Sequence, residues 1–387
     1  MPRLMLALIA AGQFLAMTLW FSATAAAPAI AREFSISGTG LAWLTMAVQG
    51  GFVAGTLVSA LFSIADVVNP RRLLLAGCIA GALANASIAF ASSETSIILL
   101  RAATGAALAF VYPPGLKIAA GWFRERRGTA MGIVVGALTT GSAFPHLLVW
   151  AAADVPWRQL MYVSSALAIV GGAIVIGGVK DGPHVTASAP FDPRAVGAVL
   201  QNRGVRLATL GYLGHMWELY AMWAWIPAFA AASLALRGGA STDGSLVAFV
   251  AIASGAIGCV MAGLWGDAWG KARIAGGAML TSGSCALLAG LFYGSPLPVL
   301  LLFGVVWGFS IVADSAQFSA LVSEHSPRTH VGTALTLQIC VGFLLTMISM
   351  RLLPMIAAWS GWQWAFASLA PGPLLGAAAM ARLRRMT

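Results

Sequence analysis

The chain has 387 residues, of which 59% are hydrophobic and 9% are charged, and its mean hydropathy is +0.87. This composition excludes a soluble globular protein and is typical of a chain that crosses a membrane many times. The net charge of +10 does not indicate a nucleic-acid-binding protein, because most basic residues lie in short loops between apolar runs. We therefore expect a lipid bilayer, and no nucleic acid, as the partner of this chain.

Apolar runs of about 20 residues, the length that crosses a bilayer, can be placed twelve times. Backbone polar groups in hydrocarbon must be satisfied within their own segment, so each run is predicted to be a helix. The predicted spans begin near Leu4, Gly40, Leu73, Ser96, Thr129, Gln159, Leu207, Leu246, Ile274, Val299, Val331 and Trp362. With the amino terminus in the cytoplasm, most arginines and lysines also lie there, which is the usual charge bias of membrane proteins. Both termini are therefore predicted to be cytoplasmic.

The first span carries Gln13, Met17 and Trp20 at helical spacing. This stripe predicts either contact with a substrate in a central cavity, through Gln13 and Trp20, or ordinary packing around one hydrogen-bonded glutamine. The sequence leaves both interpretations open. The apolar run is too long for the core of a signal peptide, so we retain it as a span.

The fourth span contains Arg101, and an ionisable side chain inside a bilayer is costly enough to suggest a function. At about 100° per residue, Arg101 and Tyr112 share one helix face, although Pro113 is expected to bend the helix. We predict that both side chains contact the substrate. The alternative is that Arg101 only ties helices together. In the fifth span, His146 is either a ligand contact or a hydrogen-bonded packing residue.

Residues 180–206 form a polar connection without a GxxxxGK[ST] pattern and without a Gly-rich turn after a strand. The chain also lacks HExxH and GxSxG patterns. We therefore expect neither ATP-driven transport nor an enzyme, and no cofactor. Four cysteines lie in apolar spans without metal-ligand spacing, so no metal site is expected. They are Cys78, Cys259, Cys285 and Cys340.

The seventh span carries His215, Glu218 and Trp225 on one stripe. Since His215 and Glu218 are i and i+3 neighbours, they can exchange a hydrogen bond or a proton. Burial disfavours the charged form of a carboxylate, which suits a group that loads and releases a proton. We predict proton coupling at Glu218 and His215, with a permanent salt bridge as the alternative. Trp225 is predicted to contact the substrate.

A charged loop, GLWGDAWGKAR at residues 263–273, lies between the eighth and ninth spans. A weaker copy lies in the first half, where Asp66 and Arg72 precede Asp267 and Arg273 by 201 residues each. The chain therefore contains two copies of one unit. Other residues replace the glycines in the first copy, so we expect any function of this loop mainly in the second.

The duplicated GxxGDxxGKxR pattern in a twelve-span chain resembles the signature loop of the major facilitator superfamily of bacterial transporters. The resemblance implies two pseudo-symmetric six-helix bundles, residues 1–179 and 207–387, joined by a cytoplasmic loop at residues 180–206. It also implies alternating access around a substrate bound between the bundles, in the inner membrane. We expect a monomer. The residues implied in conformational gating are Asp66, Arg72, Gly263, Asp267, Gly270, Lys271 and Arg273.

The tenth span is the repeat partner of the fourth, but it carries Asp314 and no basic residue at the place of Arg101. We predict that Asp314 handles protons. The alternative is that it anchors Arg328 or His325 at the cytoplasmic end. In the eleventh span, Gln338 is predicted to contact the substrate. The two halves would then divide the work, with anion binding in the first and proton handling in the second.

These features predict a proton-coupled secondary transporter for a small organic anion, because the guanidinium of Arg101 can bind a carboxylate with two hydrogen bonds. One alternative is a proton antiporter that exports drugs or other amphipathic compounds, suggested by the tryptophans of the seventh span. Drug antiporters of this superfamily usually carry GxxxGP in the fifth span, whereas the proline here comes only at Pro145. The last alternative is a transporter-like ligand sensor, which is disfavoured because no signalling domain is expected.

Overall fold

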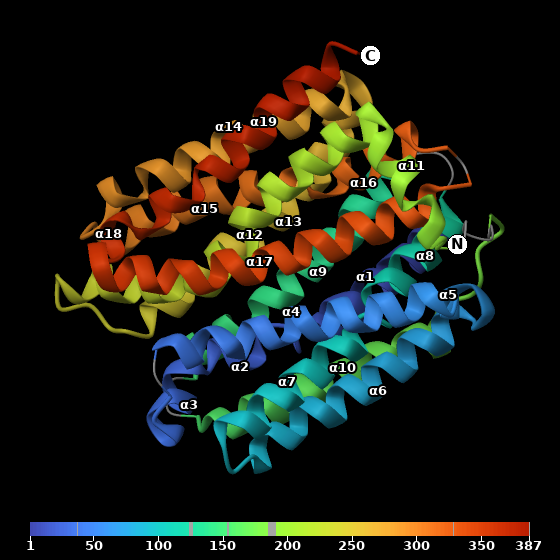
Figure 1. Ribbon diagram of the computed structural model, residues 1–387. Helices are drawn as coiled ribbons and strands as arrows, with labels where there is room; N and C mark the ends of the chain where they lie inside the picture. Colours follow the sequence, from blue (N-terminus) through green and yellow to red (C-terminus); the bar gives the residue numbers. More distant parts are fainter. Residues whose placement is uncertain (37, 124–126, 153–154, 185–190, 328, 387) are drawn as a thin grey trace.

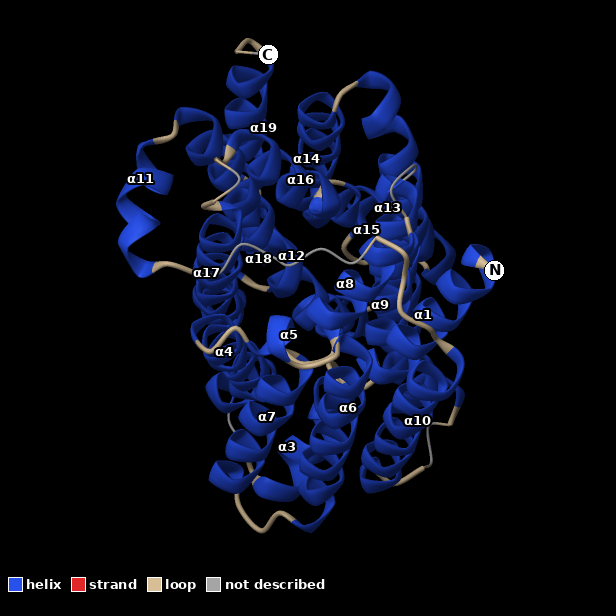
Figure 2. Ribbon diagram, turned by 90° about the vertical axis from the view of Figure 1, so that its right-hand side faces the viewer, coloured by secondary structure: helices blue, strands red, loops and turns tan. Residues whose placement is uncertain are grey.

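The computed structural model describes residues 1–387 except 37, 124–126, 153–154, 185–190, 328 and 387. Within the described residues every regular element is a helix (Figure 1, Figure 2). The first half contains α1 Pro2–Met17, α2 Ser22–Ala25, α3 Ala27–Phe34, α4 Gly38–Leu61, α5 Ile64–Val67, α6 Pro70–Ser87, η1 Ile88–Phe90, α7 Glu94–Leu108, α8 Tyr112–Trp122, α9 Arg127–Ala151 and α10 Trp157–Gly178. Between the halves lie the short helices η2 Pro193–Ala195 and α11 Val196–Gln201.

The second half repeats the long helices of the first. It contains α12 Arg203–Ala235, α13 Asp243–Trp269, α14 Lys271–Leu288, η3 Ala289–Phe292, α15 Leu297–Ala313, α16 Ser315–His325, α17 Val331–Ser360, α18 Trp362–Ala365, η4 Phe366–Leu369 and α19 Pro371–Arg384. Each predicted span start lies within four residues of a helix start, and the largest difference is that between Leu207 and Arg203.

Ten spans in the described part of the chain are long and apolar enough to cross a membrane. The other two predicted spans are α1, which has 16 residues and is continued by α2 beyond a break, and α12. The 33 residues of α12 include several tryptophans, a histidine and a glutamate, which lower its mean hydropathy. The prediction of an all-α membrane protein with twelve spans is confirmed.

Three of the spans are broken near the middle. Span 4 consists of α7 and α8, and Pro113 near the start of α8 explains the break at residues 109–111, because proline starts a helix more easily than it continues one. Span 10 is broken at the corresponding place, where Asp314 separates α15 from α16. In span 1, α1 ends at Met17 and α2 begins at Ser22. Such breaks free backbone carbonyl groups, which must find partners within the protein.

The two halves form six-helix bundles that lie side by side, drawn blue to green and yellow to red in Figure 1. Equivalent helices begin at nearly constant offsets, for example α6 and α14 at Pro70 and Lys271, and α8 and α16 at Tyr112 and Ser315. Both termini of the chain lie at one end of the bundles, together with α5 and α11 (Figure 1). The helices α3 and α18 lie at the opposite end. The sequence repeat is therefore a repeat of structure, as predicted.

The bundles meet where α9 packs against α13 and α4 packs against α17. Glycines on α9 allow the close approach to α13. A Cβ atom added at Gly132 would lie 2.8 Å from the carbonyl oxygen of Cys259, and one at Gly136 would lie 3.1 Å from that of Ala256. Larger side chains at these positions would separate the two helices. The α9–α13 contact thus depends on small residues.

Candidate functional site

Arg101 on α7 is fully buried inside the first bundle, beside the break in span 1. Its guanidinium donates hydrogen bonds to the carbonyl oxygens of Leu44 at 3.0 Å, Leu19 at 2.9 Å and Trp20, and to Ser22 Oγ at 3.3 Å. Four of the five guanidinium N–H groups are therefore occupied by the protein. In the structure Arg101 joins neighbouring helices, which was the alternative interpretation of this residue in the sequence. Contact between Arg101 and a substrate stays a prediction.

The hydrogen bonds of Arg101 continue to Asn85 on α6. Ser22 Oγ donates to Asn85 Oδ1 at 2.7 Å. Asn85 Nδ2 then donates to the carbonyl oxygen of Met161 at 3.0 Å and to Ser165 Oγ at 3.1 Å. Because the cation, hydroxyl and amide satisfy one another, this network joins five helices of the first bundle, α2, α4, α6, α7 and α10, into one unit.

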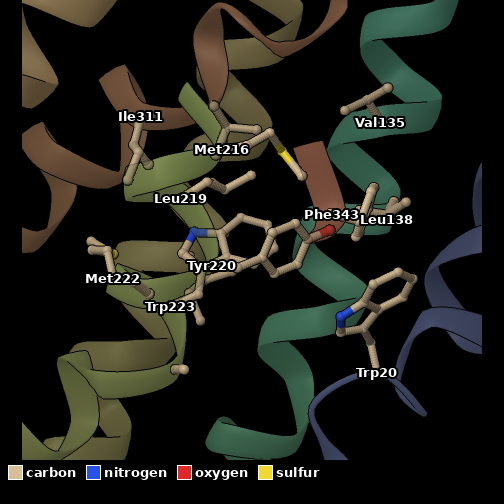
Figure 3. Packing of buried hydrophobic residues seen from close by; sticks show 14 of the residues in the cluster. Trp20, Val135, Leu138, Met216, Leu219, Tyr220, Met222, Trp223, Ile311 and Phe343 are labelled. Atoms are coloured by element: carbon tan, nitrogen blue, oxygen red, sulfur yellow. The ribbon is translucent and has the colours of Figure 1, made fainter. Parts of the chain in front are cut away.

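Aromatic side chains from both bundles meet at the centre of the molecule. We call the following six residues the central aromatic cluster: Trp20, Phe21, Phe52, Tyr220, Trp223 and Phe343. Trp20 stacks on Tyr220 with 5.8 Å between ring centroids, and Phe52 lies 4.7 Å from Phe343. Figure 3 shows Tyr220 reaching from α12 towards Leu138 of α9, with Trp20 nearby. The cluster therefore spans the boundary between the bundles.

Several buried polar atoms have no hydrogen-bond partner among the described residues. Among them are Nε1 of Trp20 and Trp223 in this cluster, both imidazole nitrogens of His146 beside Phe21, and the side-chain amides of Gln49 and Gln338 on α4 and α17, the helices that carry Phe52 and Phe343. All five side chains are at most 2% exposed. An unsatisfied buried polar group costs roughly 1–3 kcal/mol, so such groups are uncommon unless a ligand or water binds there. These five residues and the cluster form the candidate binding site.

Two of the predicted substrate contacts, Trp20 and Gln338, belong to this site. Tyr112 lies at its edge, because its ring centroid is 6.4 Å from that of Phe52. The site also contains Trp223, which the sequence analysis did not select. A signal for it existed, since Trp223 follows Trp20 by the same offset that relates the starts of α8 and α16.

The other two predicted contacts, Gln13 and Trp225, have protein partners outside the central cluster. Gln13 Nε2 donates to the carbonyl oxygen of Val111 at 3.0 Å inside the first bundle, which joins α1 to the break in span 4. Trp225 Nε1 donates to the carbonyl oxygen of Met350 at 2.9 Å inside the second bundle. Helical periodicity placed these residues on plausible stripes, but each stripe packs within its own bundle.

Glu218 on α12 is buried within the second bundle. Its carboxylate accepts hydrogen bonds from Ser282 Oγ at 2.8 Å and from Trp307 Nε1 at 2.7 Å. Neither partner is His215, so the predicted exchange between these i and i+3 neighbours is absent from the described contacts. The reason is that α14 and α15 supply neutral donors that reach both carboxylate oxygens.

His215 instead faces Asp314, at the break between α15 and α16. His215 Nδ1 lies 2.8 Å from Asp314 Oδ1, and its Nε2 lies 3.0 Å from Ser315 Oγ. Both members of this pair are buried, at 2% side-chain exposure each. Of the predicted alternative anchors for Asp314, Arg328 lies outside the described residues. The other, His325, has its Nδ1 2.8 Å from the carbonyl oxygen of Leu321.

The loop at residues 263–273 joins α13 to α14. Gly270 has a φ of +90°, a conformation that L side chains rarely adopt, so glycine allows the turn here. Gly263 faces α9, since an added Cβ atom would lie 2.9 Å from the carbonyl oxygen of Gly128. Asp267 is exposed and lies beside Gly128 at the start of α9. Lys271 Nζ lies 2.8 Å from Glu324 Oε1.

The first copy of this loop is held differently. Arg71, the neighbour of the predicted gating residue Arg72, pairs with Asp181 through two hydrogen bonds of 2.9 Å. Arg72 is exposed. Asn69 accepts a hydrogen bond from the backbone N–H of Arg71 and so caps α6. The side chain of Asp66 lies outside the described residues. Asn69, which stands where the second copy has Gly270, therefore serves as the N-terminal cap of α6.

The described residues contain no group of three or more His, Cys, Asp or Glu side chains that could hold a metal ion. The four cysteines are all buried and free. They pack as small apolar residues within the helices.

A model of the Major Facilitator Superfamily matches residues 9–262 of this chain. The chain is 25% identical to the hexuronate transporter of Escherichia coli (strain K12), over 96% of this chain and 91% of that protein. It is also 25% identical to the 3-(3-hydroxy-phenyl)propionate transporter of the same strain, over 92% of this chain and 87% of that protein. The human organic anion transporter MFSD10 (TETRAN) shares the fold, with a TM-score of 0.74 and 15% identity over 98% of this chain and 99% of that chain. This chain therefore belongs to the major facilitator superfamily and is a membrane transporter, not an enzyme.

Proposed function

We propose that this protein is a secondary transporter that carries a small organic acid across a bacterial inner membrane by alternating access. The observation that carries this proposal is the candidate binding site, where unpartnered polar groups surround an aromatic cluster buried between the bundles. A site in this position is exposed to one side and then the other when the bundles rock about it. The relatives named for hexuronate and for 3-(3-hydroxy-phenyl)propionate support an organic acid as the substrate.

The moving parts in this proposal are residues 1–179 and 207–387, joined by residues 180–206, in a monomer. The shared end of the two termini (Figure 1) and the basic residues of the same end support a cytoplasmic position for both. The loop at residues 263–273 acts as a brace. Asp267 reaches the start of α9 in the other bundle, where a helix N-terminus favours a negative charge.

The proposed proton site is the pair of His215 and Asp314, with Glu218 as a further carrier. Adding or removing one proton leaves one member of the pair charged and the other neutral. An uncompensated buried charge is strongly unfavourable, so the pair must then separate or rearrange. Because Asp314 lies at the break between α15 and α16, protonation can change how these helices are joined to α12.

Solute-dependent proton movement tests the proposal. Purified protein is placed in liposomes that contain a pH-sensitive dye, and glucuronate, 3-phenylpropanoate or the lipophilic cation tetraphenylphosphonium is added outside. We expect one of the acids to change the lumenal pH faster than it does in protein-free liposomes, where only passive entry of the protonated acid contributes. A response to the cation alone would support the drug-antiport alternative. A lack of response to all three compounds would contradict the proposal.

A further inference from the structure

The candidate site contains one buried basic side chain that the protein leaves without a partner. Arg101 donates four hydrogen bonds to its own bundle. Lys117 Nζ donates to the carbonyl oxygen of Ala65 at 2.6 Å. His215 lies between Asp314 and Ser315. His146 on α9 is 0% exposed, and neither of its ring nitrogens has a partner among the described residues.

His146 lies directly beside the central aromatic cluster. Its ring centroid is 6.2 Å from that of Phe21. Phe21 in turn lies 5.9 Å from Trp223 and 6.4 Å from Tyr220, both of the second bundle. The ring of Phe21 therefore contacts both the imidazole of His146 and the aromatic side chains of the second bundle.

We propose that His146 receives the carboxylate of the substrate while the central aromatic cluster holds an aromatic ring, so that the transported acids are aromatic monocarboxylates. This inference rests on the proposed function, because it names the substrate class of the same site. It transfers to His146 the anion-binding role that the sequence suggested for Arg101.

The chemistry of the unpartnered atoms fits a carboxylate. An imidazole carries at least one N–H group in either protonation state, so His146 can donate a hydrogen bond to a carboxylate oxygen. The free indole N–H groups of Trp20 and Trp223 are donors only. Three side chains near Phe21 thus offer donors to an acid, and the hydrogen bonds are strong because the acceptor is charged and the site is buried.

The side chains that surround the site are aromatic, which favours an aromatic ring over a sugar as the ligand. Trp20, Tyr220 and Phe343 lie with ring centroids 5.3–5.9 Å apart, within the range at which aromatic rings attract one another. A sugar acid carries several hydroxyl groups, each of which needs a partner once it is buried. Within the candidate site as defined above, the unpartnered groups that offer acceptors are His146 and the amides of Gln49 and Gln338. The site therefore satisfies one carboxylate, but not a ring of hydroxyl groups.

Equilibrium binding to the purified full-length protein tests this inference, with 3-phenylpropanoate, its uncharged analogue 3-phenylpropanamide, and glucuronate as ligands. We expect the parent protein to bind 3-phenylpropanoate at least ten-fold more tightly than either other compound. In His146→Leu, the acid should bind about as weakly as the amide, whose own affinity should change little. His184→Leu is the matched control, because His184 is exposed outside the spans, and it should keep the parent values.

A second variant covers the case in which His146→Leu does not fold. Trp20→Phe keeps an aromatic ring but removes the indole N–H donor, so it should weaken binding of the acid more than binding of the amide. Tighter binding of glucuronate than of 3-phenylpropanoate by the parent would overturn the inference and leave the proposed function intact. An unchanged preference for acid over amide in His146→Leu would overturn the role of His146. If neither acid is bound or transported, the proposed function itself fails.

Discussion

Spans 4 and 10 are repeat partners and are broken at equivalent places, but the polar groups around them differ. Arg101, on span 4, is surrounded by neutral carbonyl and hydroxyl oxygens. Asp314, at the break of span 10, faces the titratable ring of His215. A guanidinium remains protonated in proteins, whereas histidine changes its charge near neutral pH. The duplicated scaffold therefore carries a fixed network in one half and, in our proposal, a proton-sensitive pair in the other.

The largest expected effect follows from removing the fixed cation. Arg101→Gln leaves several buried carbonyl groups without their donor, which should lower the free energy of unfolding by about 3 kcal/mol or more. Thermal unfolding in detergent measures the loss as a lower Tm. Arg101→Lys keeps the charge but has no planar fork, so its Tm should lie between those of Arg101→Gln and the parent. Equal Tm values for all three would contradict the tying role.

The proton-sensitive pair predicts a loss of coupling. Asp314→Asn removes the carboxylate, so uptake driven by a pH gradient should fall about ten-fold or more, a loss typical of a missing proton-transfer group. Exchange of substrate without a gradient should continue. The double variant with His215→Asn should be little worse than either single variant, because the two residues act as one unit. If only Glu218→Gln abolishes coupling, the proton site lies at Glu218 and the comparison between spans 4 and 10 must be revised.

A smaller loss of stability is expected from a substitution at the α9–α13 contact, where the two bundles meet. Gly263→Val places a side chain against the backbone of Gly128 on α9 and should cost about 1–3 kcal/mol of stability. Gly277→Val on α14 is the matched control, since an added Cβ atom there has no neighbour within 4 Å. Tm and initial uptake rates measure both variants. Equal behaviour of the two would show that the α9–α13 contact tolerates side chains.

The smallest effect concerns a surface pair of the first bundle. Hydrogen bonds from Arg158, and then from Trp157, hold the pKa of the Glu33 carboxyl below its ordinary value. Because the folded-state pKa is lowered, the stabilisation is present above the ordinary pKa and is lost as the pH falls through the lowered one. Acidification from pH 6 to pH 3 should therefore lower the Tm of the parent slightly more than that of Glu33→Gln. Parallel Tm curves would show that this exposed pair contributes nothing measurable.

The candidate site shows what helical periodicity indicates and what it leaves open. Trp20 and Gln338, both predicted to contact the substrate, belong to the candidate binding site, and their contact with a substrate stays a prediction. Trp225 was selected by the same reasoning, but its indole binds a carbonyl group of its own bundle. Trp223, two residues earlier, packs instead against Phe21 of the other bundle and belongs to the central aromatic cluster (Figure 3). A helical stripe identifies a face of the helix but does not show which neighbour covers it.

The sequence by itself determined the number and starts of the twelve spans, the repeat, and the position of the charged loop at residues 263–273. These features depend on local properties, since apolar length and backbone conformation act within one segment. Only the tertiary structure decided the partners of the buried polar groups. Arg101 binds the carbonyl groups of another span, and His215 pairs with Asp314 rather than with nearby Glu218. Buried polar groups take whichever partner the packing brings within reach, and that partner lies far away in the chain.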